Sequence, residues 1–147
     1  MEATETITLQ VPSNTRYLSL VGACVAEVCR RVEGLPDPEK TTYDIQLAVN
    51  EAAVNAIKHA HGGSPHDQVK VIFSLFPGRL EIDIYDRGEG FDLAAVPEPD
   101  LEEPHEGGYG LMIIKELMDE VSYHRDPVRG NQLHLVKYLV GREHHVG

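Results

Sequence analysis

The sequence predicts an α/β fold of two layers, in which helices cover one face of a mixed, mostly antiparallel sheet. Some segments alternate apolar and polar residues, which is typical of strands, and others repeat apolar residues every three or four positions, which is typical of helices. The order β-α-α-β-β-loop-α-β-β lets consecutive strands pair and leaves the helices to one face. The 147 residues are expected to form a single domain, 1–147.

The N-terminal half is expected to contain one strand and two helices. Residues 4–11 alternate as a half-buried strand does. One apolar stripe at helical spacing follows, formed by Leu18, Val21, Val25, Val28 and Val32. The second helix is expected from about Glu39 to Ala60, and small residues on its buried side would let it lie close to the sheet.

The C-terminal half is expected to add two hairpins and one helix. Its elements are strands at 69–75 and 80–86, a helix opened by 107–110, and strands at 121–124 and 133–139. The segment 93–106 is acidic, contains prolines and has no usable period. Loops of this length inside small domains are often lids over a site, so we expect a lid there.

Composition narrows the classes of function. Thirteen basic against twenty-four acidic residues give a net charge of −11, without the basic footprint of nucleic-acid binders. No apolar run approaches the ~20 residues that span a bilayer, and the first residues do not resemble a signal peptide. We therefore expect a cytoplasmic protein that binds neither nucleic acid nor membrane. Cys24 and Cys29 fall on different faces of a helix and are expected to be unpaired thiols.

The first motif lies on the second predicted helix. Spacings of four place Glu51, Asn55 and His59 on one face, one above the next. An asparagine amide oxygen suits Mg²⁺, and a carboxylate one turn away can take a proton from a hydroxyl group. Taken alone, this segment is also typical of a solvated polar stripe.

The second motif follows a predicted strand directly. Asp86, Gly88 and Gly90 form Asp-x-Gly-x-Gly at its end. The aspartate can accept a hydrogen bond from an adenine amino group, and the glycines allow a ligand to approach the backbone. Taken alone, the motif is also typical of a simple turn.

The third motif, Gly107-Gly108-Tyr109-Gly110, stands at a predicted helix start. Backbone N–H groups at a helix N-terminus bind phosphate oxygens well. The motif is neither a Walker loop nor a dinucleotide fingerprint. A glycine-rich helix start without a ligand is the alternative.

The order and spacing of these three motifs are shared by few folds, and with them the chain resembles the GHKL ATPases. Within that superfamily it resembles the anti-sigma-factor serine/threonine kinases. Residues 48–60 look like the N box, 86–92 like the first glycine box and 107–114 like the second. Residues 117–121 also match the family closely.

The resemblance implies a role for each matching residue. Asn55 would bind the Mg²⁺ that bridges the ATP phosphates, and Glu51 would deprotonate the acceptor hydroxyl. Asp86 would hold the adenine amino group. The remaining expected nucleotide-binding residues are His59 on the phosphate side, Gly88 and Gly90 in the adenine wall, and Gly108 and Gly110 as a phosphate cradle.

Two positions depart from the family pattern. Asn131-Gln132 stand where the family tends to place a threonine near the adenine. Either amide could supply the hydrogen bond, and Gln132 is included among the expected nucleotide-binding residues. Tyr109 stands where an arginine is frequent, so a charged phosphate contact is expected to be missing.

The resemblance implies an ATP- and Mg²⁺-dependent serine/threonine protein kinase that also acts as an anti-sigma factor. Its partners would be an anti-sigma-factor antagonist that accepts the phosphate, a sigma factor, and a second copy of the chain in a homodimer. The alternative is a nucleotide-gated binding module that sequesters a regulator without useful kinase activity. Glu51 favours the kinase, because a pure binder does not need a base there.

Overall fold

The computed structural model describes residues 2–58, 67–87, 108–126 and 130–140. Five strands form one sheet in the order β1-β2-β3-β5-β4. The elements are β1 (Glu5–Pro12), the 3-10 helix η1 (Thr15–Tyr17), α1 (Leu18–Arg30), α2 (Pro38–Lys58), β2 (Gln68–Phe76), β3 (Arg79–Asp86), α3 (Gly108–Leu117), β4 (Glu120–Asp126) and β5 (Gly130–Tyr138).

The predicted architecture is confirmed, with one refinement of the sheet. All neighbouring strands in the described ranges pair antiparallel, so the sheet there is antiparallel rather than mixed. The β2–β3 hairpin turns at Gly78, whose φ of 89° is readily adopted by glycine. Its register sets Phe73 opposite Ile82, and both side chains are fully buried.

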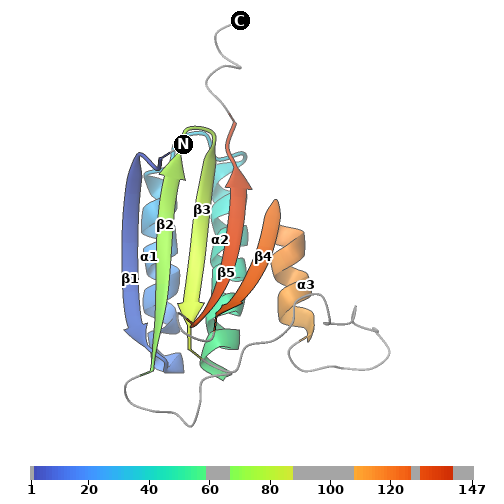
Figure 1. Ribbon diagram of the computed structural model, residues 1–147. Coiled ribbons are helices and arrows are strands. Elements are labelled where there is room, and N and C mark those ends of the chain that lie inside the picture. Colours follow the sequence, from blue (N-terminus) through green and yellow to red (C-terminus); the bar gives the residue numbers. More distant parts are fainter. Residues whose placement is uncertain (1, 59–66, 88–107, 127–129, 141–147) are drawn as a thin grey trace, which may run out of the picture.

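The helices pack on one face of the sheet. Figure 1 shows α1 and α2 behind the strands and α3 beside β4 at the sheet edge. One hydrophobic cluster joins residues of β1, the helices α1, α2 and α3, and the strands β2, β3 and β5. Burial of this apolar surface is the main favourable term that holds the two layers together. No helix in the described part of the chain is long and apolar enough to cross a bilayer.

The helix α2 is packed closely on its small residues, as predicted. Ala48 is fully buried and Ala52 is nearly so, and Gln46 Nε2 donates a hydrogen bond of 3.0 Å to the Gly22 carbonyl of α1. The helix begins one residue before the predicted start, at Pro38, a residue favoured in the first helical turn. Its predicted last residues, 59 and 60, lie outside the described ranges.

The two cysteines are unpaired, as predicted. Cys29 is buried and Cys24 is half-buried, both on α1. Burial raises the pKa of the Cys29 thiol to about 11 and also raises that of Cys24. Both thiols are therefore neutral at physiological pH.

Candidate functional site

Four elements that carry predicted site residues end close together. The C-terminal part of α2, the N-terminus of α3, the end of β3 and the start of β5 all lie at the lower end of the molecule in Figure 1. Helix α2 packs against both α1 and α3, which holds its polar residues beside the first turn of α3. The fold thus gathers segments that are more than twenty residues apart in the sequence.

Glu51 and Asn55 of α2 meet α3 at Gly110. A Cβ atom built on Gly110 would lie 3.1 Å from Glu51 Oε2 and 3.2 Å from Asn55 Nδ2. Any side chain there would crowd the tips of both residues, so the absent side chain lets the helices approach. The structure therefore brings together the expected base, the expected metal ligand and one of the expected phosphate-binding glycines.

The side-chain amide of Asn55 is buried at this junction, where the described residues leave a hydrogen-bond donor unsatisfied. The residue is only 7 % exposed, and its Nδ2 has no hydrogen-bond partner among the residues that the structure describes. Leaving a buried donor unsatisfied is destabilising by roughly 1–3 kcal/mol. A polar ligand between α2 and α3 would relieve this penalty.

The first turn of α3 provides backbone donors next to this amide. The helix begins at Gly108, and the first N–H groups of any α-helix lack partners within the helix. They also carry the positive end of the helix dipole, which favours phosphate oxygens. The predicted phosphate-binding position at Gly108 and Gly110 therefore coincides with a helix start in the structure.

A second part of the candidate site lies where β3 ends and β5 begins. Asp86 stands opposite Asn131 in the strand register, and Asn131 Nδ2 donates a hydrogen bond of 3.0 Å to Asp86 Oδ1. Gly130 permits this approach: its φ is 98°, and a Cβ there would lie 2.5 Å from the Asp86 carbonyl oxygen. Asp86 and Asn131 continue the faces of Ile84 and Leu133, which pack in the core under the helices.

Gln132 does not share this position with Asp86. Side chains alternate along a strand, so Gln132 faces the side of the sheet away from the helices. Its Nε2 donates to Asp83 Oδ1 over 2.7 Å, and His134 Nδ1 lies 2.6 Å from the same oxygen. Of the two amides that the sequence analysis left open, Asn131 lies beside Asp86 and Gln132 lies on the other face, and the expected role of Gln132 in nucleotide binding stays a prediction.

Several predicted site residues fall outside the ranges that the structure describes. His59, Gly88, Gly90 and the lid segment 93–106 lie outside the described residues. Within the described ranges, no three His, Cys, Asp or Glu side chains form a metal-binding group. Mg²⁺ at ATP sites commonly takes only one or two protein oxygens beside phosphate and water oxygens, so an amide and a carboxylate suit it chemically.

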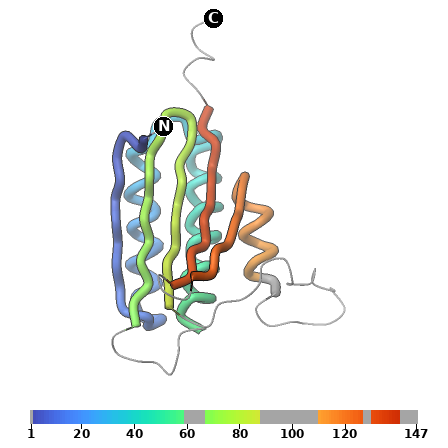
Figure 2. The backbone as a smooth tube through the Cα atoms, in the orientation of Figure 1, coloured from blue at the N-terminus to red at the C-terminus, as the bar shows by residue number. Residues whose placement is uncertain are grey.

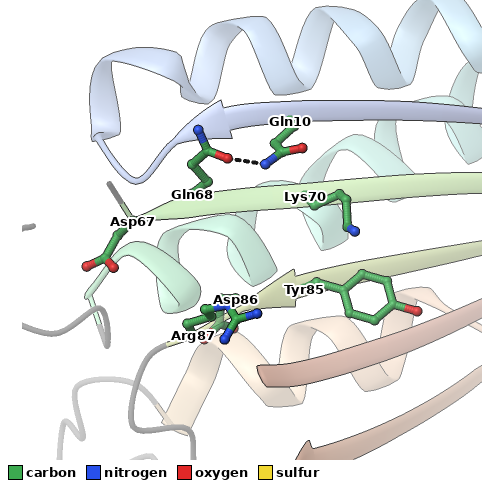
Figure 3. Close-up of a pocket in the computed structure, with 7 residues that line it drawn as sticks. All are labelled: Gln10, Asp67, Gln68, Lys70, Tyr85, Asp86 and Arg87. Atoms are coloured by element: carbon green, nitrogen blue, oxygen red, sulfur yellow. Dashed lines mark hydrogen bonds between the residues drawn. The ribbon is translucent and has the colours of Figure 1, made fainter. Parts of the chain in front are cut away.

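A cavity of about 220 Å³ opens on the other face of the sheet, at the same end. Figure 3 shows its lining along the ends of β1, β2 and β3: Gln10, Asp67, Gln68, Lys70, Tyr85, Asp86 and Arg87. Lys70 Nζ lies 5.4 Å from the centre of the Tyr85 ring, and Gln10 donates to Gln68. No sequence motif indicated this cavity, because its residues come from three neighbouring strands and from the positions next to their ends.

Comparison with known proteins gives consistent results. Residues 11–137 match the family described as Histidine kinase-like ATPase domain. A serine-protein kinase RsbW of Oceanobacillus iheyensis is 30% identical over 145 residues, covering 93% of this chain and 89% of that protein. RsbW of Staphylococcus epidermidis is 33% identical (90% and 86% covered), and RsbW of Bacillus subtilis 29% (92% and 86%).

Proposed function

Because the chain belongs to the histidine kinase-like ATPase family, we propose that it is an ATP-dependent serine/threonine protein kinase that also acts as an anti-sigma factor. The relatives that it resembles over most of their length carry the name serine-protein kinase. The family, the order of the three motifs and the junction of α2 with α3 support this proposal together.

One observation carries the proposal: a buried amide without a partner and a carboxylate both meet a glycine at a helix start. A donor such as Asn55 Nδ2 is stabilised when a polar ligand occupies the junction. Gly110 lets the tips of Glu51 and Asn55 lie close to the start of α3. A ligand rich in oxygen atoms and negative charge, such as a nucleotide phosphate chain, suits these neighbours best.

Each described residue has one task in the proposed site. Asn55 would hold Mg²⁺ through its amide oxygen, and the N–H groups at Gly108 and Gly110 would hold phosphate oxygens. The Asp86 carboxylate accepts a hydrogen bond from the adenine amino group, and Asn131 stands beside it. His59, Gly88 and Gly90 complete the nucleotide site, and residues 93–106 form its lid within a single domain, 1–147.

The proposed reaction moves one phosphoryl group and one proton. ATP supplies the γ-phosphoryl group, and Mg²⁺ held at Asn55 would supply positive charge to the phosphates. Glu51 Oε2 accepts the proton of the partner's serine or threonine hydroxyl, while that oxygen forms its bond to phosphorus and the bond to the ADP oxygen breaks. Phosphoryl transfer depends mainly on positioning and charge neutralisation, which Mg²⁺ at Asn55 and the N–H groups at the start of α3 would supply.

The proposed partners are proteins. The phosphate acceptor is an anti-sigma-factor antagonist, a small domain with a phosphorylatable serine, and the sequestered protein is a sigma factor. We also propose that the chain acts as a homodimer in the cytoplasm. The net charge of −11 suits a basic protein partner and does not suit nucleic acid.

Transfer of labelled phosphate tests the proposal directly. The chain is incubated with labelled MgATP and the antagonist encoded beside its gene, and the label on the antagonist is followed over time. We expect label on the antagonist, and its loss in Glu51→Ala and in Asn55→Ala. Glu39→Ala is the matched control, because Glu39 is an exposed carboxylate in the first turn of the same helix.

Two other outcomes would change the conclusion. ATP binding without label on the antagonist would support the nucleotide-gated binding module instead of the kinase. Absence of ATP binding would contradict both.

A further inference from the structure

The proposed reaction leaves the cavity on the outer face of β1, β2 and β3 unused, apart from Asp86 at its edge. Figure 2 shows β1 beside β2, although two helices separate them in the sequence. The strand register sets Gln10, Lys70 and Tyr85 in one row across the three strands. The volume of about 220 Å³ equals that of about seven water molecules, so the cavity suits a small molecule.

The lining side chains that face outward carry positive charge or none. Side chains alternate along a strand, and Val69 and Val71 are fully buried on the helix side, so Lys70 points to the outer face. Tyr85 and then Arg87 follow the same alternation at the end of β3, and both line the cavity (Figure 3). The other two outward-facing lining residues are glutamines.

Lys70 keeps its hydrogen-bonding capacity for a ligand. Its Nζ lies 5.4 Å from the centre of the Tyr85 ring, and it forms no ion pair within the described ranges. An aromatic ring attracts an ammonium group, but the three N–H donors of lysine remain available to oxygen atoms. On the same face, by contrast, Arg79 is paired with Glu81.

Asp67 provides a different chemistry at the start of β2. It lines the same cavity, and its Oδ2 is buried without a hydrogen-bond partner among the residues that the structure describes. The backbone N–H of Ser13 donates to the Asp67 carbonyl over 2.9 Å, which fixes the backbone at this position. An unsatisfied buried acceptor is destabilising, and a hydroxyl donor would relieve this penalty. The cavity thus combines a cationic side with a carboxylate that needs a donor.

We propose that this cavity binds a small hydroxylated anion, which is a phosphate ester or a carboxylate that also carries hydroxyl groups. Its charged oxygen atoms would meet Lys70 and Arg87, and one hydroxyl group would donate to Asp67. The amides of Gln10 and Gln68 can donate to further hydroxyl groups or accept from them. Because the chain has a net charge of −11, such an anion is held by these local contacts and not by the overall charge.

Titration calorimetry with four probes tests the inference on the chain without nucleotide. Glycerol 3-phosphate and glycerate carry both charge and hydroxyl groups on carbon, inorganic phosphate lacks the carbon-borne hydroxyl groups, and glycerol lacks the charge. We expect glycerol 3-phosphate, glycerate or both to bind at least about tenfold more tightly than the other two probes, the effect of one hydrogen bond to a charged group. The comparison of the two hydroxylated anions distinguishes a phosphate ester from a carboxylate.

Three variants assign the contacts. Lys70→Ala should weaken the hydroxylated anions about tenfold or more, because a charged donor is lost. Asp67→Ala should weaken them as well but leave inorganic phosphate unchanged, a difference that a merely structural role would not produce. Lys40→Ala is the control and should change nothing, because Lys40 is an exposed cation of α2 that pairs with Asp44.

Four results would overturn the inference. The first is a hydroxylated anion that binds no more tightly than inorganic phosphate in both cases, and the second is no binding of any probe up to about 10 mM. The third is binding that Lys70→Ala leaves unchanged, since the probe would then lie elsewhere. If a variant does not fold, NMR shifts of the wild type with glycerol 3-phosphate decide, and shifts confined to residues outside 67–70 and 85–87 are the fourth. Nucleotide is absent throughout, so each of these failures leaves the proposed kinase intact.

Discussion

The outer face of the β3–β5 pair and the junction of α2 with α3 treat polar side chains differently. On the outer face, Asp83 receives two partners, and Glu81 is paired with Arg79, so the charges there are satisfied within the protein. On the inner side, α2 buries the Asn55 amide without a partner where it meets α3. Natural proteins rarely leave buried donors unsatisfied. The contrast separates a polar surface that supports the fold from a polar junction that is suited to a ligand.

The largest expected effect is on the rate of phosphoryl transfer, and it comes from substituting Glu51, the proposed base where α2 meets α3. Glu51→Gln preserves the size and polarity of the side chain but cannot take the proton of the acceptor hydroxyl. We expect kcat for phosphoryl transfer to fall by about 10²–10⁴-fold, with little change in the Kd of MgATP. Rapid-mixing kinetics and calorimetry measure the two quantities. A variant that transfers phosphate at the wild-type rate would remove Glu51 from the mechanism.

A smaller effect is expected when a methyl group is inserted where α2 and α3 pack closely. Gly110→Ala places a methyl group 3.1 Å from Glu51 Oε2 and 3.2 Å from Asn55 Nδ2, so both tips must shift. We expect the KM for ATP to rise about tenfold, the effect of a lost hydrogen bond to a charged group, while the fold persists.

Gly22→Ala in α1 is the matched control for that substitution. No atom lies within 4 Å of a Cβ built on Gly22. The change should raise the free energy of unfolding by about 0.5–1 kcal/mol, since alanine is the better helix former, and leave KM unchanged. Equal kinetic effects of the two substitutions would contradict the special role of the α2–α3 junction.

The smallest expected effect is a pH-dependent change in the free energy of unfolding, caused by His134 on the outer face of the sheet. The Asp83 hydrogen bond raises the pKa of His134 above its usual value, helped by Glu81 and Glu120, although partial burial opposes the rise. A raised pKa in the folded state stabilises the fold fully below about pH 6.5, and this contribution is lost as pH rises through the folded-state pKa.

Urea unfolding between pH 5.5 and 9 tests the pair of His134 and Asp83. Because His134 is partly exposed, we expect its contribution to be about 1 kcal/mol or less. His134→Gln should flatten the pH dependence of the unfolding free energy by that amount and leave ATP binding unchanged. If the free energy of unfolding of the wild type rises over this pH interval and His134→Gln removes the rise, the raised pKa of His134 is contradicted.

Much of the fold follows from local patterns in the sequence. The strand–helix order and the apolar stripe of α1 predicted the two layers, and the buried alanines of α2 predicted its close packing. These patterns succeed because hydrophobic periodicity reports which side of each element is buried. The antiparallel pairing of every described strand was predicted in part, since the hairpins are local.

The candidate site was predicted less completely, for geometric reasons. The helical spacing of Glu51 and Asn55 is fixed by the helix and could be foreseen. The choice between Asn131 and Gln132 could not, because it depends on the positive φ of Gly130 and on the register with β3. The partnerless state of Asn55 Nδ2 depends on how closely two helices pack, which no local pattern encodes.

In the proposed site, the buried amide of Asn55 is kept for a nucleotide at the cost of stability. Asn55→Leu, which replaces it by an apolar side chain of similar size, tests this claim in one calorimetric and unfolding experiment. We expect the free energy of unfolding without ligand to rise by about 1 kcal/mol or more, because an unsatisfied buried donor is removed. MgATP binding should weaken at least about tenfold in the same protein. A variant that is less stable and still binds MgATP as the wild type does would contradict the account.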